Sequence, residues 1–179
     1  EDYECDTLLL SCGLIPENEL SRSAGVEMSP VTSGPLVNES LETSIEGVFA
    51  CGNVLHVHDL VDFVSEEAAA AGRNAAVYVK GERTAAEGKV VRMNPTDGVR
   101  YTVPASIRPD QMDDQLTVRF RVGGVYKNCY VCVYFDDECV SRRKRPVVAP
   151  GEMEEVKLEK AKLLERPDLK TITIKIEEA

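Results

Sequence analysis

The chain has 179 residues, 43% of them apolar, a composition that allows a buried core in one large or two small domains and excludes a disordered chain. The net charge of −10 arises in residues 1–80, where 3 basic residues stand against 14 acidic ones, which argues against nucleic acid or an anionic membrane as a partner. No apolar run approaches the roughly eighteen residues of a membrane span, and the opening EDYECD is not a signal peptide, so we expect a cytoplasmic protein with reduced cysteines.

The first half is predicted to combine strands with one helix. Apolar runs that end at or near a glycine, or lie between turn residues, predict strands at residues 7–15, 34–39 and 47–51. The apolar and alanine-rich pattern from Asp59 to about Lys80 predicts a helix, with Asp59 as its N-cap and Asp62 as the capping partner. Gly81 stands where such a helix would stop.

The second half has a different period. A polar, turn-prone stretch makes residues 82–88 the predicted linker between residues 1–81 and a domain at residues 89–179. Strands are predicted there at residues 90–93, 99–107, 116–122, 128–135, 140–148, 154–163 and 171–177. In LTVRFRV and TITIKIE, every second residue is apolar, which predicts one buried face per strand. Seven short strands with tight turns predict an antiparallel, immunoglobulin-like sandwich.

One segment of the first half resembles a known motif. ETSIEGVFACGN is similar to the second flavin-binding motif of the FAD-dependent pyridine nucleotide-disulfide oxidoreductases, relatives of thioredoxin reductase. That motif runs Thr, a spacer, Gly, an apolar strand, Gly and Asp, matched here by Thr43, Gly47, VFAC, Gly52 and Asn53. The upstream DTLLLSCGLIPENEL and the downstream alanine-rich helix also resemble the family, so the likeness covers about residues 5–81.

The resemblance implies a fold class and a cofactor site. The chain is expected to be an α/β fragment, the C-terminal part of a Rossmann-like FAD domain, followed by the all-β sandwich. Gly52 lets the backbone approach the cofactor, and Asn53 binds a ribityl hydroxyl where most of the family has Asp. The helix N-terminus at Leu60, Val61 and Asp62 faces the flavin ring, where its dipole stabilises the anionic reduced form.

The family's other parts are missing from this sequence. No GxGxxG fingerprint for the FAD pyrophosphate or for NAD(P)H is present, and the first half has no CxxC pair. The chain is therefore expected to be the C-terminal fragment of an FAD-dependent, NAD(P)H-linked oxidoreductase, inactive alone and without bound FAD. Asn followed by LHVHDLVD resembles the branch associated with glycerol-3-phosphate, amino-acid or opine dehydrogenase systems. Expected partners are the rest of the parent chain, a dehydrogenase or electron-acceptor subunit, and a second copy paired through exposed strand edges.

The sandwich, the two histidines and the CxxC pair of the second half each allow a second interpretation. The sandwich can instead be the working part, as a non-catalytic protein-interaction module. His56, His58 and Asp59 suggest a metal site, but two histidines and one carboxylate in a short loop favour loop packing or helix capping, and no metal site is predicted. Cys129 and Cys132 have CxxC spacing within a predicted strand, where residues three apart face opposite sides, so core cysteines are predicted.

Overall fold

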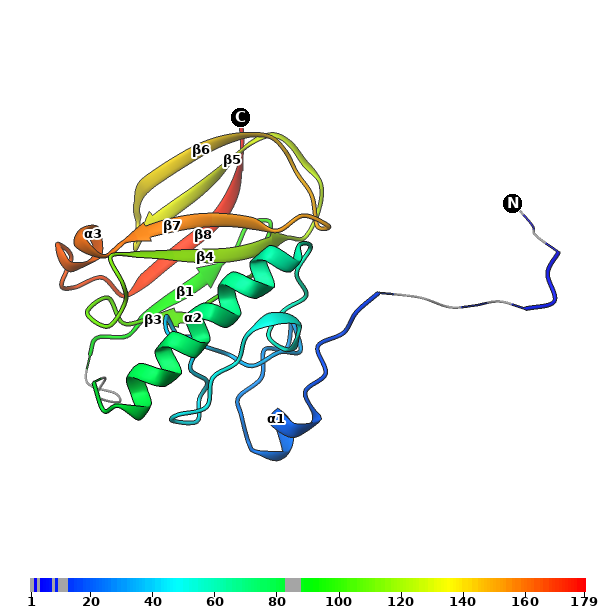
Figure 1. Ribbon diagram of the computed structural model, residues 1–179. Helices are drawn as coiled ribbons and strands as arrows, with labels where there is room; N and C mark the ends of the chain where they lie inside the picture. The colour runs from blue at the N-terminus through cyan, green and yellow to red at the C-terminus, as the bar shows by residue number, and fades with distance from the viewer. Residues whose placement is uncertain (1, 3, 8, 10–12, 83–87) are drawn as a thin grey trace.

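The computed structural model describes residues 2, 4–7, 9, 13–82 and 88–179 (Figure 1). After residue 88 the elements are β1 (Val91–Pro95), β2 (Val99–Val103), β3 (Ser106–Ile107), β4 (Gln115–Val122), β5 (Tyr126–Phe135), β6 (Glu138–Val148), β7 (Glu154–Glu159), α3 (Lys160–Leu164) and β8 (Thr171–Glu178). Each predicted strand overlaps an observed one, with two corrections. Residues 99–107 form two strands in different sheets, because Pro104 lies between them and has no backbone N–H to donate. Residues 154–163 begin as β7 but end as the helix α3.

These strands form two sheets. Their orders are β3-β1-β8-β5-β6 and β2-β4-β7. All neighbours are antiparallel except β1 and β8, which run parallel with Arg92 opposite Thr171 and Pro95 opposite Ile174. A constant immunoglobulin domain instead has four strands on one sheet and three on the other, all antiparallel. The immunoglobulin-like type therefore stays a prediction.

One large core joins the two sheets. The predicted alternation is confirmed in β4, where Val118, Phe120 and Val122 are fully buried, and in β8, where Ile172 and Ile174 are. The same cluster takes in residues from β1, β2, β3, β5, β6 and β7 and from the segment around α3. Burying a side chain of this size stabilises the fold by about 1.5–3 kcal/mol, so this cluster is the main source of stability.

The first half has little regular structure. Its elements are α1 (Glu19–Ser23), the 3₁₀-helix η1 (Gly52–Val54) and α2 (Val61–Val79). The strands predicted at residues 34–39 and 47–51 are wrong: within residues 13–82 there are only isolated bridges, Met28 with Pro35 and Glu42 with Phe49. A strand persists only where a neighbour satisfies its backbone groups along its length, and here the pairing stays local.

Two predictions fall partly on residues that are not described. Of the strand predicted at residues 7–15, residues 8 and 10–12 lie outside the described residues, and residues 7, 9 and 13–15 form no strand. Of the predicted linker at residues 82–88, residues 83–87 lie outside them as well.

The long helix is where the sequence predicted it, but it starts differently. α2 ends with Lys80 as its C-cap, and Gly81 follows at φ +69° with its N–H bonded to the Tyr78 carbonyl oxygen, as expected of a glycine stop. The predicted N-cap is wrong. Leu60 occupies that position and has no polar side chain with which to cap the helix.

α2 lies across the outer face of the three-stranded sheet (Figure 1). The Arg119 side chain on β4 stacks on the Phe63 ring at 5.2 Å and pairs with Glu66 at 2.8 Å, which explains why a residue on the polar face of β4 is 9% exposed. A second, smaller core lies at this contact. It consists of Val37, Leu41, Ala50, Leu55, Ala71 and Val103. Val103 belongs to β2, so this core spans the predicted domain boundary.

Candidate functional site

The turn at η1 brings a glycine against the first turn of α2. Gly52 is buried and has φ +70°, a backbone conformation that residues other than glycine rarely adopt. A Cβ added there would lie 3.3 Å from Cγ1 of Val64. The fold itself therefore requires glycine at this position, whether or not a cofactor lies nearby.

A buried carboxylate holds this turn in place. The Gly52 N–H donates to Glu67 Oε2 at 2.6 Å, from a residue fifteen positions earlier in the chain. Nε2 of His56 lies 3.0 Å from Glu67 Oε1, and Nε2 of His58 lies 3.1 Å from Glu67 Oε2. An ionised carboxylate only accepts hydrogen bonds, so both imidazoles donate through Nε2–H and are in the same tautomer. The relative exposures of His56, His58 and Glu67 are 1%, 8% and 2%.

The charges of this cluster follow from burial and hydrogen bonding. Burial alone raises the pKa of the Glu67 carboxyl, but hydrogen bonds from His56, His58 and the Gly52 N–H, with the charge of His56, lower that pKa to about 2. Burial lowers the pKa of His56, and its bond to Glu67 offsets this only in part. At neutral pH the site thus holds an anionic carboxylate beside a neutral His56.

Glu67 was not singled out from the sequence. Its signal is a charged residue on the buried stripe of a helix, four positions after Phe63 and four before Ala71. The sequence groups His56 and His58 with Asp59, a set for which no metal site is predicted. Asp59 points to Arg121 of β4 and accepts the Met153 N–H from the loop before β7. It therefore neither joins the histidines nor caps α2.

The predicted cofactor residues other than Thr43 lie around the η1 turn and the start of α2, with Gly52 buried and the others exposed. Asn53 is exposed, and its Oδ1 accepts the His58 N–H at 3.2 Å, which ties the loop after η1 to its start. Leu60 and Val61 are 55% and 75% exposed at the start of α2, and Asp62 is exposed beside them. The start of α2 thus consists of exposed residues next to the Gly52 turn, and the N-cap residue makes no side-chain cap.

Thr43 lies apart from this place, in a turn of its own. Its hydroxyl accepts the Ile45 N–H at 3.2 Å, and its N–H donates to the Val48 carbonyl oxygen at 2.8 Å. Gly47, at φ +76°, lies under the Tyr78 ring, where a Cβ would come within 2.8 Å of Cε1. Among the described residues, no hydrogen bond joins Thr43 to Gly52 or Asn53, so both motif residues of this turn have local structural roles.

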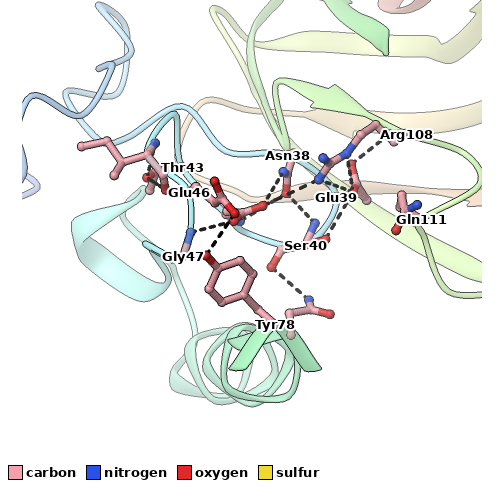
Figure 2. A network of polar contacts seen from close by, with 12 residues as sticks. Asn38, Glu39, Ser40, Thr43, Glu46, Gly47, Tyr78, Arg108 and Gln111 are labelled. Atoms are coloured by element: carbon pink, nitrogen blue, oxygen red, sulfur yellow. Dashed lines mark hydrogen bonds and ion pairs between the residues drawn. The ribbon is translucent and has the colours of Figure 1, made fainter. Parts of the chain in front are cut away.

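The same turn is fixed to both halves of the molecule (Figure 2). Arg108, just after β3, donates from its backbone N–H and Nε to the buried Glu39 carboxylate at 2.9 and 3.1 Å. On the other side, Tyr78 of α2 donates to Glu46 at 3.1 Å, and Asn74 donates to the Ser40 carbonyl oxygen at 3.0 Å. Residues 38–47 therefore connect α2, through polar contacts, to the two-sheet part of the chain after residue 88, called the sheet domain below.

The cysteines of the second half do not form a site. Cys129 and Cys132 are buried in β5, as predicted, and burial raises the pKa of the Cys132 thiol to about 11. Cys5 and Cys139 are exposed. Cys12 lies outside the described residues.

Comparisons with known proteins agree with the family resemblance of the first half. Residues 1–75 match the family model described as pyridine nucleotide-disulphide oxidoreductase. A curated relative, the NAD(P)H sulfur oxidoreductase (CoA-dependent) of Pyrococcus abyssi (strain GE5 / Orsay), is 33% identical over 60 residues, which are 34% of this chain. The match spans 13% of the length of that relative. No solved structure matches. These findings support an origin of the first half in this oxidoreductase family.

Within the described residues, no helix is long and apolar enough to cross a membrane.

Proposed function

We propose that residues 1–81 contribute the ribityl and isoalloxazine half of a flavin site to an FAD-dependent, NAD(P)H-linked oxidoreductase. The observation that carries this proposal is the pairing of the Gly52 turn with the exposed N-terminus of α2. A helix start that presents free N–H groups to solvent attracts negative charge, such as that of a reduced flavin ring. The match to the oxidoreductase family supports the proposal.

Each residue of this surface has a role in the proposal. The Gly52 backbone approaches the cofactor, and the Asn53 side chain binds a ribityl hydroxyl on the exposed side of the turn. The N–H groups of residues 60–62 face the N1 and C2=O edge of the ring. Val54, Leu60 and Val61 are 41%, 55% and 75% exposed, and they supply apolar surface against the ring. Thr43 acts indirectly, by shaping the turn of residues 43–47.

The β-sandwich keeps the helix start open in this arrangement. Asp59 stands one position before the N-cap Leu60, and its carboxylate is bound by Arg121 and the Met153 N–H and not by the α2 amides. We infer that the sandwich, of immunoglobulin-like type in our proposal, is the docking module of the intact enzyme for a dehydrogenase or electron-acceptor subunit. The chain without a GxGxxG segment is proposed to be inactive and to retain no FAD.

The test uses the coding sequence upstream of Glu1. If it encodes a GxGxxG segment, the protein that contains both parts should purify with bound FAD and oxidise NAD(P)H. Asn53→Ala in that protein should lower the FAD content, while Asn128→Ala, at the distant start of β5, should not. A colourless protein of the full length, or equal FAD content in both variants, would contradict the proposal.

The alternative is a non-catalytic interaction module carried by the sandwich. The observation that favours it is β6, an edge strand whose first seven residues are exposed and include Arg142, Arg143 and Lys144. An unpaired strand edge invites an added strand, from an acidic partner or from a second copy. A flavin-free full-length protein that binds such a partner would favour this function over the enzyme.

A further inference from the structure

Three side chains converge in the interior beside the Gly52 turn. His56 and His58 come from the loop after η1, and Glu67 comes from the second turn of α2. The two imidazole rings meet edge to face, with centroids 4.3 Å apart and planes at 62°. Both rings direct Nε2 at the same carboxylate, one at each oxygen. Two nitrogen atoms thus gather around the oxygen atoms of one carboxylate.

The separations match those of ligands around a single ion. The ligand atoms of His56, His58 and Glu67 all lie within 4.8 Å of one another. Two atoms bonded to one zinc ion at about 2.0–2.2 Å, with bond angles of about 90–109°, lie about 2.8–3.6 Å apart. The observed Nε2 to oxygen distances are 3.0 and 3.1 Å. These two pairs therefore already have the spacing of atoms that share an ion, and the remaining separations require side-chain shifts.

The charge of the cluster also favours a cation. Glu67 is 2% exposed, and within the described part of the chain its ion-pair partners are the two imidazoles. Arg119 lies on the adjacent strand, but its guanidinium pairs with Glu66. Buried carboxylates in proteins are normally paired with a cation or coordinate a metal. The two imidazoles satisfy hydrogen bonds of Glu67 through neighbouring nitrogen atoms, which are themselves metal ligands in proteins.

We propose that His56, His58 and Glu67 bind one divalent transition-metal ion of the kind that takes imidazole and carboxylate ligands, such as Zn²⁺. The site is independent of the proposed flavin function. One of the three ligands, Glu67, also accepts a hydrogen bond from the Gly52 N–H. A bound ion therefore stiffens the Gly52 turn from inside the protein.

Binding requires a specific proton rearrangement. Without the ion, each imidazole carries its proton on Nε2 and donates it to Glu67. With the ion, Nε2 becomes the ligand and the ring proton sits on Nδ1. Neither Nδ1 atom has a hydrogen-bond partner among the described residues. Because the outer partner that normally fixes a ligand histidine is missing, we expect weaker affinity than at a structural zinc site.

The experiment uses the whole chain, without an affinity tag and stripped of metal by a chelator. Zn²⁺ is titrated by calorimetry while ¹⁵N–¹H spectra report the tautomer of each imidazole. The chain has only two histidines, so both signals are assigned by single variants. We expect one Zn²⁺ per chain and a change from the Nε2–H to the Nδ1–H tautomer at both rings. Co²⁺ should bind without a sulfur-to-cobalt charge-transfer band.

Variants separate a site from surface binding. Loss of an outer-shell partner typically costs 10–100-fold in metal affinity, so Glu67→Gln should cost more than about 100-fold. Glu66→Gln, the neighbouring carboxylate on α2, and Cys132→Ser should stay within about threefold of the unchanged protein. If Glu67→Gln does not fold, as judged by its amide spectrum, His58→Gln takes its place with the same expectation.

Several outcomes would overturn the proposal. One is the absence of Zn²⁺ binding up to millimolar concentration in the folded chain. A second is an adventitious ion only, bound equally by Glu67→Gln, by His58→Gln and by the controls, or bound with a thiolate band. A third is saturation by Zn²⁺ with both imidazoles still in the Nε2–H tautomer, because hydrogen bonding to Glu67 would then persist.

Discussion

The two halves of this molecule are stabilised in different ways. The sheet domain has a core of nineteen buried residues shared by two sheets, whereas the first half shares a core of six, one of which is Val103 of β2. The buried polar groups show the opposite distribution: Asn18, Glu39, Ser40, His56, His58 and Glu67 are in the first half, against Thr102, Arg119 and Glu154 in the second.

The sheet domain is stabilised mainly by apolar burial, and the first half mainly by hydrogen bonds and ion pairs. Apolar burial is non-directional, so the sheet domain needs only its alternating pattern and tight turns. The first half depends on directional bonds, among them Arg108 to Glu39 and Gly52 to Glu67, and on packing against the sheet. We therefore expect the first half to depend on the second, but not the reverse.

The largest effect is expected in the sheet core. Phe120→Ala removes a fully buried ring between the sheets, which should lower the free energy of unfolding by about 3–5 kcal/mol. Chemical denaturation measures this loss, and amide exchange should show α2 and the strands opening together. Lys144→Ala, exposed on β6, should change stability by less than about 0.5 kcal/mol.

The smaller core provides the converse test. Leu55→Ala, also fully buried, should cost about 2–3 kcal/mol, because fewer apolar neighbours surround it. Exchange should accelerate at α2 amides such as Ala71, while Val131 in β5 keeps its protection. Equal acceleration at Val131 would show that the two halves unfold as one unit and would contradict the expected one-way dependence.

The next effect concerns the buried carboxylate. Glu67→Gln replaces an acceptor of three hydrogen bonds by an amide that has one acceptor oxygen, and in metal-free buffer it should cost about 1–3 kcal/mol. Asp62→Asn, exposed in the first turn of the same helix, is the matched control and should cost less than about 1 kcal/mol. Equal losses would mean that only helix electrostatics matter.

Acidification should weaken the same cluster in two steps. The pKa of His56 is lower in the folded than in the unfolded protein, so stability falls as the pH drops below about 6.5, by at most about 1.4 kcal/mol per pH unit. The pKa of Glu67 is also lowered, to about 2, so its contribution is present above pH 4.5 and is lost between pH 4.5 and 2. Unfolding free energies of His56→Gln in metal-free buffer should lack the first step. If the variant keeps that step, another group causes it.

The smallest effect is expected at the helix start. Arg121→Gln releases the Asp59 carboxylate, which stands one position before the N-cap Leu60 and can then approach the first α2 amides, so the net change in stability should stay within about 1 kcal/mol. The amides of the first α2 turn should exchange more slowly than in the unchanged protein. Faster exchange there would show that Arg121 supports the helix start and does not keep it open.

The elements of the second half were predicted more accurately than those of the first half, because strict periodicity identifies strands and helices and the first half has little of it. Strands with strict alternation, such as β4 and β8, and the periodic helix α2 lie within about two residues of their predicted bounds. The strands predicted at residues 34–39 and 47–51 failed, because an apolar run does not reveal whether a pairing partner exists. Arg119 likewise lies on the face of β4 that the alternation predicts to be exposed, because nothing in the sequence of β4 shows that α2 covers this face.

The candidate site was predicted in part. The motif located Gly52, Asn53 and the start of α2, which the structure brings together, and also Thr43, which it places elsewhere. The sequence predicted no role for Glu67, because that role depends on a contact with Gly52, fifteen residues earlier. A charged residue on the apolar stripe of a helix was the available signal.

The most direct test of the proposed flavin surface is an amide NMR titration of this chain with FMN, oxidised and reduced, against ribose 5-phosphate as the control ligand. Our account predicts shift changes confined to residues 52–54 and 60–63, larger for the reduced, anionic flavin and absent for the control. Changes of equal size with ribose 5-phosphate, changes centred elsewhere, or no change in either redox state would contradict it.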